Sequence, residues 1–345
     1  MAQFKSNPGA GRRVLVIFPG ALGDMICVGP ALRAIGRANS GCEIELMARA
    51  ELARFATGRM GIARGYSIDR REVSELFVDQ PANLATTKAF FSGFERIYSF
   101  FAENNREFRQ KIGEVANGPV DFIPFRPPGP GHVADRYLDA VLAAGGYPDV
   151  RSTSRNELSR IDVLAEDLEA ASATLGKHRL APGEFVLIFP GSGSPKKNWL
   201  AENFAALARQ IEPKMRAVVV IGPAEAAIEP IFKGKFATLG GLELGEIAGM
   251  ARLAAGFVGN DSGVSHLAAA AGAIGVVLFG PTDPERWRPL GHAEVLRREP
   301  LASLAVGEVA ERLADLCQSS SGMVTINAEG SPNARALFDW KKDRS

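Results

Sequence analysis

The run from Gly259 to Ala270 has the residue types and order of an anion-binding site. A short apolar run, Gly256–Val258, precedes it, and an alanine-rich helical pattern follows its small polar residues. This order predicts a strand, a tight turn and a helix whose first N–H groups point into the turn. Such N–H groups and the helix dipole favour negative charge. The alternative is that Asp261 or Ser262 only caps the helix.

The loop from Gly191 to Trp199 is a second candidate for binding an anion. Ser192, Ser194 and Lys197 lie among its glycines. Glycine lets the backbone approach an anion closely, and hydroxyls with cations suit a diphosphate. The alternative is a solvated loop with surface lysines.

Two carboxylates follow predicted strands and are candidates for a catalytic and a binding role. Asp24 comes after Gly20 and Gly23 at a predicted helix start, which favours its ionised form. It is a candidate general base or ligand clamp, or else a helix cap. Glu225 could accept hydrogen bonds from a ribose diol, with Glu229 as a rival. An exposed glutamate at a helix start is the alternative.

The elements that must position these residues form two similar halves. The runs Val14–Gly20 and Val186–Gly191 are continuously apolar, which is typical of parallel strands buried on both faces. Each run leads into a glycine-rich loop and an amphipathic helical pattern. Further strands are predicted at Glu43–Met47, Arg96–Phe100, Ala217–Ile221, Phe257–Val258 and Val276–Phe279. Strands that alternate with helices predict two α/β, Rossmann-like domains with parallel sheets and a cleft between them.

The chain length of 345 residues favours two domains over one. We expect an N-terminal domain over residues 1–160 and a C-terminal domain over residues 161–318. The boundary is expected in the polar stretch Pro148–Arg160 or in the helical pattern that follows it. We expect a polar tail over residues 319–345, with a short helix around Ala334–Trp340.

Composition is that of an ordinary soluble protein, with 46% hydrophobic and 23% charged residues. The net charge of +1 excludes a broad nucleic-acid-binding surface. The three cysteines are scattered, which favours free thiols over disulfides, and no metal-ligand spacing is present. We expect no signal peptide, no membrane span and a cytoplasmic location, with peripheral contact with the inner membrane left open.

Taken together, these motifs resemble glycosyltransferase family nine, the bacterial heptosyltransferases. The resemblance rests on Gly20–Asp24 with Pro30–Arg33, His132–Leu138, Pro190–Phe204, Gly259–Ala270 and Gly280–Trp287, in family order. It implies a GT-B fold with the donor in the C-terminal domain and the acceptor in the N-terminal one. It also implies metal-independent, inverting transfer from a nucleotide sugar, most often ADP-heptose, to a lipopolysaccharide-type or related lipid-linked glycan. The nucleotide sugar is then a substrate, and no cofactor is expected.

The resemblance also implies a role for each candidate residue. Asp24 matches the family's catalytic base, with Gly20 and Gly23 in its acceptor-side loop. The expected donor-binding residues are Ser192, Ser194, Lys197, Glu225, Asp261, Ser262, Gly263 and His266.

One position departs from the family pattern. Phe18 stands where the family commonly has a basic residue, so we expect an aromatic face there for a neutral acceptor. Two alternatives stay open for the whole chain: a non-catalytic protein that binds sugar nucleotides, and a Rossmann-type oxidoreductase. The second lacks the Gly-x-Gly-x-x-Gly fingerprint.

Overall fold

The computed structural model describes residues 11–78, 83–145 and 160–321, which form two compact units. The first unit contains residues 11–21, 28–78, 83–129 and 134–145. The second contains residues 22–27, 130–133 and 160–321. The predicted boundary segment Pro148–Arg160, except Arg160 itself, and the predicted helix Ala334–Trp340 lie outside the described residues. The predicted domain limits stay predictions.

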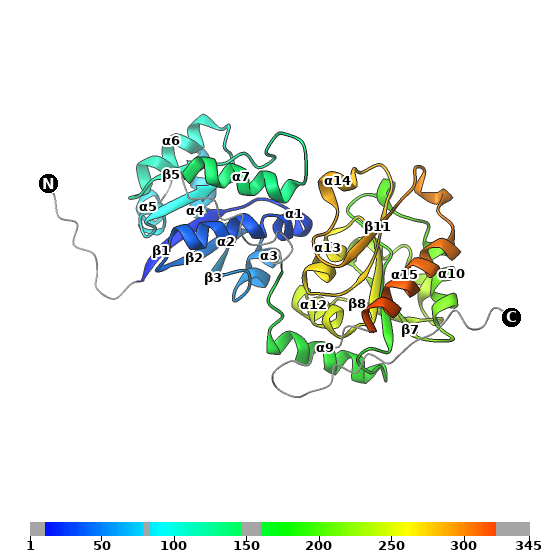
Figure 1. The fold of residues 1–345 in the computed structure, drawn as a ribbon. Coiled ribbons are helices and arrows are strands. Elements are labelled where there is room, and N and C mark those ends of the chain that lie inside the picture. The colour runs from blue at the N-terminus through cyan, green and yellow to red at the C-terminus, as the bar shows by residue number, and fades with distance from the viewer. Residues whose placement is uncertain (1–10, 79–82, 146–159, 322–345) are drawn as a thin grey trace. The chain divides into compact units, whose positions relative to one another are not determined.

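The first unit is a five-stranded parallel sheet in the order β3-β2-β1-β4-β5, covered by helices on both faces (Figure 1). Its strands are β1 (Arg12–Ile17), β2 (Cys42–Ala48), β3 (Ile62–Ser67), β4 (Arg96–Ser99) and β5 (Val120–Phe122). Its helices are α2 (Gly29–Ala38), α3 (Ala50–Ala56), α4 (Arg71–Ser74), α5 (Leu84–Phe91), α6 (Arg106–Val115) and α7 (Val133–Gly145), of which α7 starts in the second unit. One face of the sheet packs on α4, α5 and α6 through a core rich in phenylalanine.

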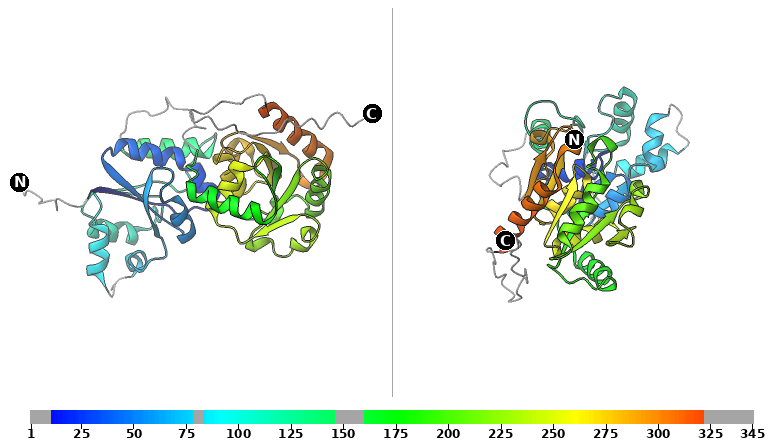
Figure 2. Two further views of the ribbon diagram at one scale, coloured as in Figure 1. Left: turned by 90° about the horizontal axis from the view of Figure 1, so that it is seen from below. Right: turned by 90° about the vertical axis from the view of Figure 1, so that its right-hand side faces the viewer.

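The second unit is a six-stranded parallel sheet in the order β11-β10-β9-β6-β7-β8 (Figures 1 and 2). Its strands are β6 (Phe185–Phe189), β7 (Arg216–Ile221), β8 (Ala237–Gly240), β9 (Gly256–Asn260), β10 (Gly275–Phe279) and β11 (Ala293–Arg297). Its helices are α1 (Leu22–Cys27), α9 (Ala165–Lys177), α10 (Ala201–Ile211), α11 (Glu229–Phe232), α12 (Leu244–Leu253), α13 (Gly263–Ala270), α14 (Pro284–Trp287) and α15 (Val306–Ser321). The strands β6, β9 and β10 are buried throughout, as expected for parallel strands covered on both faces.

The strand order of the second unit reverses between β6 and β9. A ligand in such a sheet binds beyond the carboxyl ends of the strands at that reversal. The loops after β6 and β9 both begin there. The predicted α/β fold with two parallel sheets is therefore confirmed, and the expected binding loops meet at the switch point of the second sheet.

The amphipathic helical pattern predicted after the first strand and its glycine loop is two helices in the structure. The helix α1 ends at Cys27 and α2 begins at Gly29, with Pro30 in its first turn. Proline has no N–H to continue a preceding helix, and its fixed φ favours the start of a new one. The break lets the chain place α1 in the second unit and return to the first unit at Val28.

Candidate functional site

The loop Pro190–Leu200, which joins β6 to α10 and is called the β6 loop below, contains the predicted lysine. Lys197 ends a short 3-10 helix, η2 (Pro195–Lys197), and its Nζ lies 2.7 Å from Asp261 Oδ2. The Asp261 side chain is 6% exposed, whereas that of Lys197 is 34% exposed. Lys196 is exposed beside it. The ion pair thus joins the two loops at the switch point and leaves about a third of the Lys197 side chain exposed.

Ser192 and Ser194 shape the same loop. The Ser192 hydroxyl lies 2.8 Å from the Ser194 carbonyl oxygen and 2.6 Å from Asn198 Oδ1. The Ser194 N–H donates to Ser192 Oγ at 3.2 Å. The contact between Ser192 and Asn198 closes the loop across the segment that contains Lys197.

The N-terminus of α13 is not capped by a side chain. Ser262 is the N-cap residue, but its Oγ lies 3.2 Å from Ser265 Oγ, and Asp261 is engaged by Lys197. Among the described residues, no acceptor receives the backbone N–H groups of Gly263 and Val264. The capping alternative is therefore wrong here, and α13 presents open N–H groups of the kind that bind anions.

His266 lies in the first turns of α13 and is 4% exposed. Burial lowers its pKa to about 4, with Lys197 and His132 acting in the same direction and Asp261 opposing them. The imidazole is therefore neutral at neutral pH. His266 Nδ1 lies 3.7 Å from the Cys27 Sγ.

The Cys27 thiol is the neighbour of Nδ1 of this ring. Burial raises the pKa of the thiol, and the negative charges of Asp24 and Asp261 raise it further. The thiol therefore stays protonated and can donate to His266 Nδ1. A thiol that donates to Nδ1 goes with a ring proton on Nε2, and a thiol that accepts goes with one on Nδ1.

Asp24 is half-buried on α1, in the same unit as α13. The two helices meet through a pair of glycines: a Cβ on Gly263 would lie 2.9 Å from Leu22 Cβ and 3.2 Å from Gly23 N. A Cβ on Gly23 would lie 3.4 Å from His266 Cδ2. This close approach brings Gly23 and the helix of Asp24 against the start of α13. Gly20 is buried but is part of the first unit.

Glu225 comes from a third loop of the same sheet edge. It ends the 3-10 helix η3 (Pro223–Glu225) after β7. A Cβ on Gly191 would lie 2.1 Å from Glu225 Oε1, and one on Gly222 would lie 2.4 Å from Oε2. The carboxylate therefore lies against the start of the β6 loop, and a Cβ at either of these two positions would displace it from where it lies.

Sequence reasoning missed Asn260 and Cys27. Asn260 is completely buried, and its amide bonds to both Pro190 and Trp199 in the β6 loop. The available signal was its place as the last residue of a buried strand, directly before Asp261. No local pattern marks Cys27, because its contact with His266 joins segments far apart in the sequence.

The expectation for Phe18 is wrong. Its side chain is 0% exposed, and its ring packs edge-on against Phe100, Phe125 and Tyr137 at 5.4, 5.7 and 5.8 Å between centroids. The first unit uses this aromatic cluster as core, so Phe18 offers no face to an acceptor.

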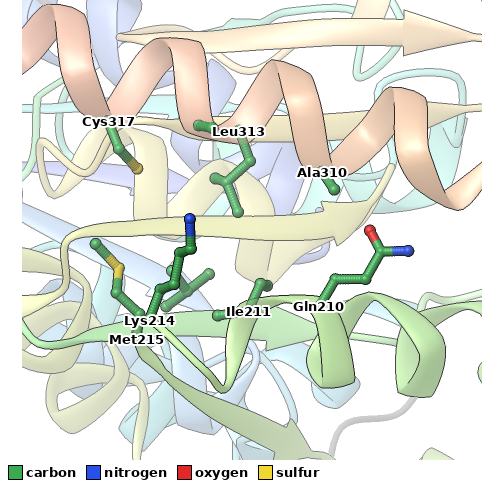
Figure 3. A pocket seen from close by; sticks show the side chains of 9 residues that line it. Gln210, Ile211, Lys214, Met215, Ala310, Leu313 and Cys317 are labelled. Carbon is green, nitrogen blue, oxygen red and sulfur yellow. The ribbon is translucent and has the colours of Figure 1, made fainter. Parts of the chain in front are cut away.

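A separate apolar pocket lies between α10 and α15 (Figure 3). Val186 near the start of β6, Met215 just before β7, and Leu313 and Cys317 of α15 line it. Because the strands are parallel, this pocket is at the amino-terminal edge of the sheet, opposite the loops described above. It is therefore not part of the candidate site.

Two further properties concern only residues 11–78, 83–145 and 160–321. Within these ranges, no three or more His, Cys, Asp or Glu side chains are grouped as a metal site would require. No helix there combines the length and the apolar character needed to cross a membrane.

Solved structures similar to this chain include heptosyltransferases and a glycosyl transferase of family 9. A glycosyl transferase family 9 protein from Veillonella parvula is 21% identical with a TM-score of 0.73, over 89% of this chain and 97% of that chain. E. coli ADP-heptose lps heptosyltransferase II is 19% identical with a TM-score of 0.69, over 90% and 99%. E. coli heptosyltransferase WaaC with ADP is 19% identical with a TM-score of 0.67, over 88% and 99%. These similarities confirm the predicted GT-B fold.

The family itself is shown by sequence. A comparison with curated protein sequences finds no match. The model of glycosyltransferase family 9 (heptosyltransferase) matches residues 123–305, just over half of the 345 residues. This range contains the β6 loop, Glu225 and the start of α13. The chain therefore belongs to glycosyltransferase family 9 and is a glycosyltransferase.

Proposed function

We propose that this glycosyltransferase moves heptose from ADP-heptose to a lipopolysaccharide-type or related lipid-linked glycan, with inversion at the anomeric carbon. The E. coli relatives support this choice of donor, since one is an ADP-heptose lps heptosyltransferase and another binds ADP and ADP-2-deoxy-2-fluoro heptose. The sugar nucleotide is a substrate, and the proposal needs no cofactor.

The observation that supports the proposal most directly is the grouping of positive charge at the switch point of the second sheet. The Lys197 ammonium and the open N–H groups of Gly263 and Val264 lie on loops joined by the Lys197–Asp261 ion pair. A diphosphate that gains charge as it leaves is stabilised by such groups without their having to reorganise. Ser192 and Ser194 support this arrangement by shaping the same loop, and the Ser192 hydroxyl would turn from its partners in the loop to donate to the diphosphate.

Two other residues recognise the rest of the donor. Glu225, beside Gly191, accepts hydrogen bonds from the ribose hydroxyls. In this proposal the neutral His266 has its ring proton on Nε2 and donates to the diphosphate or the sugar without adding a charge. A neutral donor here avoids the cost of burying an imidazolium.

Asp24 is the general base in this proposal. The acceptor hydroxyl oxygen bonds to the anomeric carbon while the bond from that carbon to the β-phosphate oxygen breaks. Asp24 takes the hydroxyl proton, and ADP leaves with the electron pair. The contact of Gly23 with α13 fixes the helix of Asp24 in the unit that binds the diphosphate. Positioned base catalysis of this kind contributes roughly 10²–10⁴-fold.

A nucleotide panel tests the donor. Thermal unfolding of the full chain is measured with ADP, UDP, GDP and NAD, because a ligand that binds only the folded state raises the melting temperature. We expect ADP to give the largest shift. A larger shift with UDP or GDP would replace the proposed nucleotide, and a shift with NAD alone would contradict the proposal.

A further inference from the structure

The side chain of Asn260 holds both ends of the β6 loop. Nδ2 donates to the carbonyl oxygen of Pro190 at 2.8 Å, and Oδ1 accepts from the backbone N–H of Trp199 at 2.9 Å. Pro190 is the first residue of the loop and Trp199 its last but one. Asn260 itself is 0% exposed, so these bonds are made away from solvent.

The two partners dictate an amide at this position. A carbonyl oxygen only accepts a hydrogen bond and a backbone N–H only donates one, so the side chain must offer a donor and an acceptor together. An aspartate in place of Asn260 would keep the bond to Trp199 but set a carboxylate oxygen against the Pro190 carbonyl oxygen. A leucine would lose both bonds and leave two buried backbone groups unpaired.

The next residue along the chain extends the same attachment. Asp261 pairs with Lys197 at 2.7 Å, so consecutive residues at the end of β9 hold the loop at its start, at its end and at its lysine. The backbone oxygen of Asn260 also accepts from Ser265 Oγ of α13 at 2.7 Å. Asn260 therefore links the β6 loop to α13, the helix whose first N–H groups are open.

We propose that Asn260 is a positioning residue, which holds the β6 loop in the conformation that presents Lys197 to the donor diphosphate. The inference rests on the proposed function and adds to it a residue that does not itself touch substrate.

The first test needs no ligand. Hydrogen exchange of the backbone N–H groups of residues 190–200 is compared in the natural sequence, in Asn260→Asp and in Asn260→Leu, each as the full chain. Asp167→Asn is the control, because Asp167 is also buried and accepts from the backbone N–H of Leu164 at the start of α9. We expect exchange in the loop to rise roughly tenfold or more in both Asn260 variants and to stay unchanged in the control. Unchanged exchange in Asn260→Asp would overturn the inference, even if Asn260→Leu fails to fold.

The second test uses ADP binding measured by calorimetry. Asn260→Asp should weaken ADP binding roughly tenfold in the natural sequence, but less than about twofold when Lys197→Met is already present, since Asn260 acts through that lysine. Equal losses in both backgrounds would overturn the inference. If loop exchange rises in the variants while the natural sequence binds no ADP, the proposed function fails and the loop-holding role of Asn260 is supported.

Lowering the pH adds a readout that a general loss of stability would not produce. A protonated carboxyl in Asn260→Asp can donate to Pro190 and accept from Trp199, as the natural amide does. Because burial raises a carboxyl pKa, ADP affinity relative to the natural sequence should recover between about pH 8 and about pH 5. Asn260→Leu cannot recover in this way. Recovery in neither variant would contradict the hydrogen-bonding role.

Discussion

Replacing Lys197 by methionine should have two separate effects, one on the affinity for ADP and one on the stability of the fold. Methionine keeps most of the apolar stem and removes the charge. The Nζ group contacts Asp261 Oδ2 at 2.7 Å and, in our proposal, also the donor diphosphate. The variant should therefore lose diphosphate affinity and also leave Asp261 without its partner.

The two magnitudes follow from charge and burial. A charged hydrogen bond contributes about 1.5–3 kcal/mol, which corresponds to roughly 10- to 150-fold weaker ADP binding. Breaking a fully buried ion pair costs about 3–5 kcal/mol. Because the Lys197 side chain is 34% exposed, solvent screens the pair, and we expect a stability loss of only about 1–2 kcal/mol.

The assay is a double-mutant cycle with Asp261→Asn, followed by calorimetric titration with ADP and by urea unfolding. The Asp261→Asn change removes the carboxylate that Lys197→Met leaves without a partner. It should therefore restore most of the stability that Lys197→Met loses, but none of the lost affinity for ADP. Lys196→Met is the matched control, because Lys196 lies next to Lys197 and is exposed. The reasoning is refuted if Lys197→Met binds ADP as tightly as the control, or if the double variant is no more stable than Lys197→Met.

Three further predictions concern the same unit. Gly263→Ala should lower the free energy of unfolding by about 1–3 kcal/mol, because the added Cβ would lie 2.9 Å from Leu22 Cβ; urea unfolding checks this against Gly176→Ala, a helical glycine with no atom within 4 Å of the added Cβ. The pKa of His266 is about 4 against an ordinary 6.5, so between these pH values the unfolded chain binds a proton that the folded chain does not. The free energy of unfolding should therefore fall on acidification through this window, by up to about 3 kcal/mol from this group, and His266→Leu should flatten the fall; a slope unchanged in the variant would argue against a neutral, buried His266. Glu225→Gln should weaken ADP binding roughly tenfold while sparing inorganic pyrophosphate, since its partner is the ribose, and calorimetry that finds equal losses for both would rule out that role.

The central strands of both sheets could be predicted from the sequence, whereas the edge strands could not. Strands such as β6, with the sequence Phe-Val-Leu-Ile-Phe, are buried on both faces and leave a continuous apolar run. The four strands that sequence analysis missed, β3, β5, β8 and β11, are the outermost strands of their sheets. An edge strand has fewer neighbours to cover it, so polar residues interrupt its pattern, as in Ile62–Ser67.

Some parts of the candidate site could likewise be predicted from local sequence, whereas others depend on contacts between distant segments. Residues in the loops that follow strand ends, such as Lys197 and Asp261, could be predicted because the parallel topology brings these loops together. The placement of α1 with the second unit could not be predicted, since it depends on the contact between Gly23 and Gly263, far apart in the sequence. The burial of Phe18 could not be predicted for a similar reason. It depends on Phe125 and Tyr137, whose proximity no local pattern reveals.

The most direct test of the proposed reaction is the rate of heptose transfer by Asp24→Asn. Turnover of ADP-heptose with a lipopolysaccharide-core acceptor and the affinity for ADP-heptose are measured for the natural sequence and for the variant. Asparagine keeps the size of the side chain but cannot take the acceptor proton. We predict that turnover falls roughly 10²-fold or more while donor affinity is unchanged, and that the product of the natural sequence has inverted anomeric configuration. Near-normal turnover by Asp24→Asn, or retained configuration in the product, would contradict the proposed mechanism.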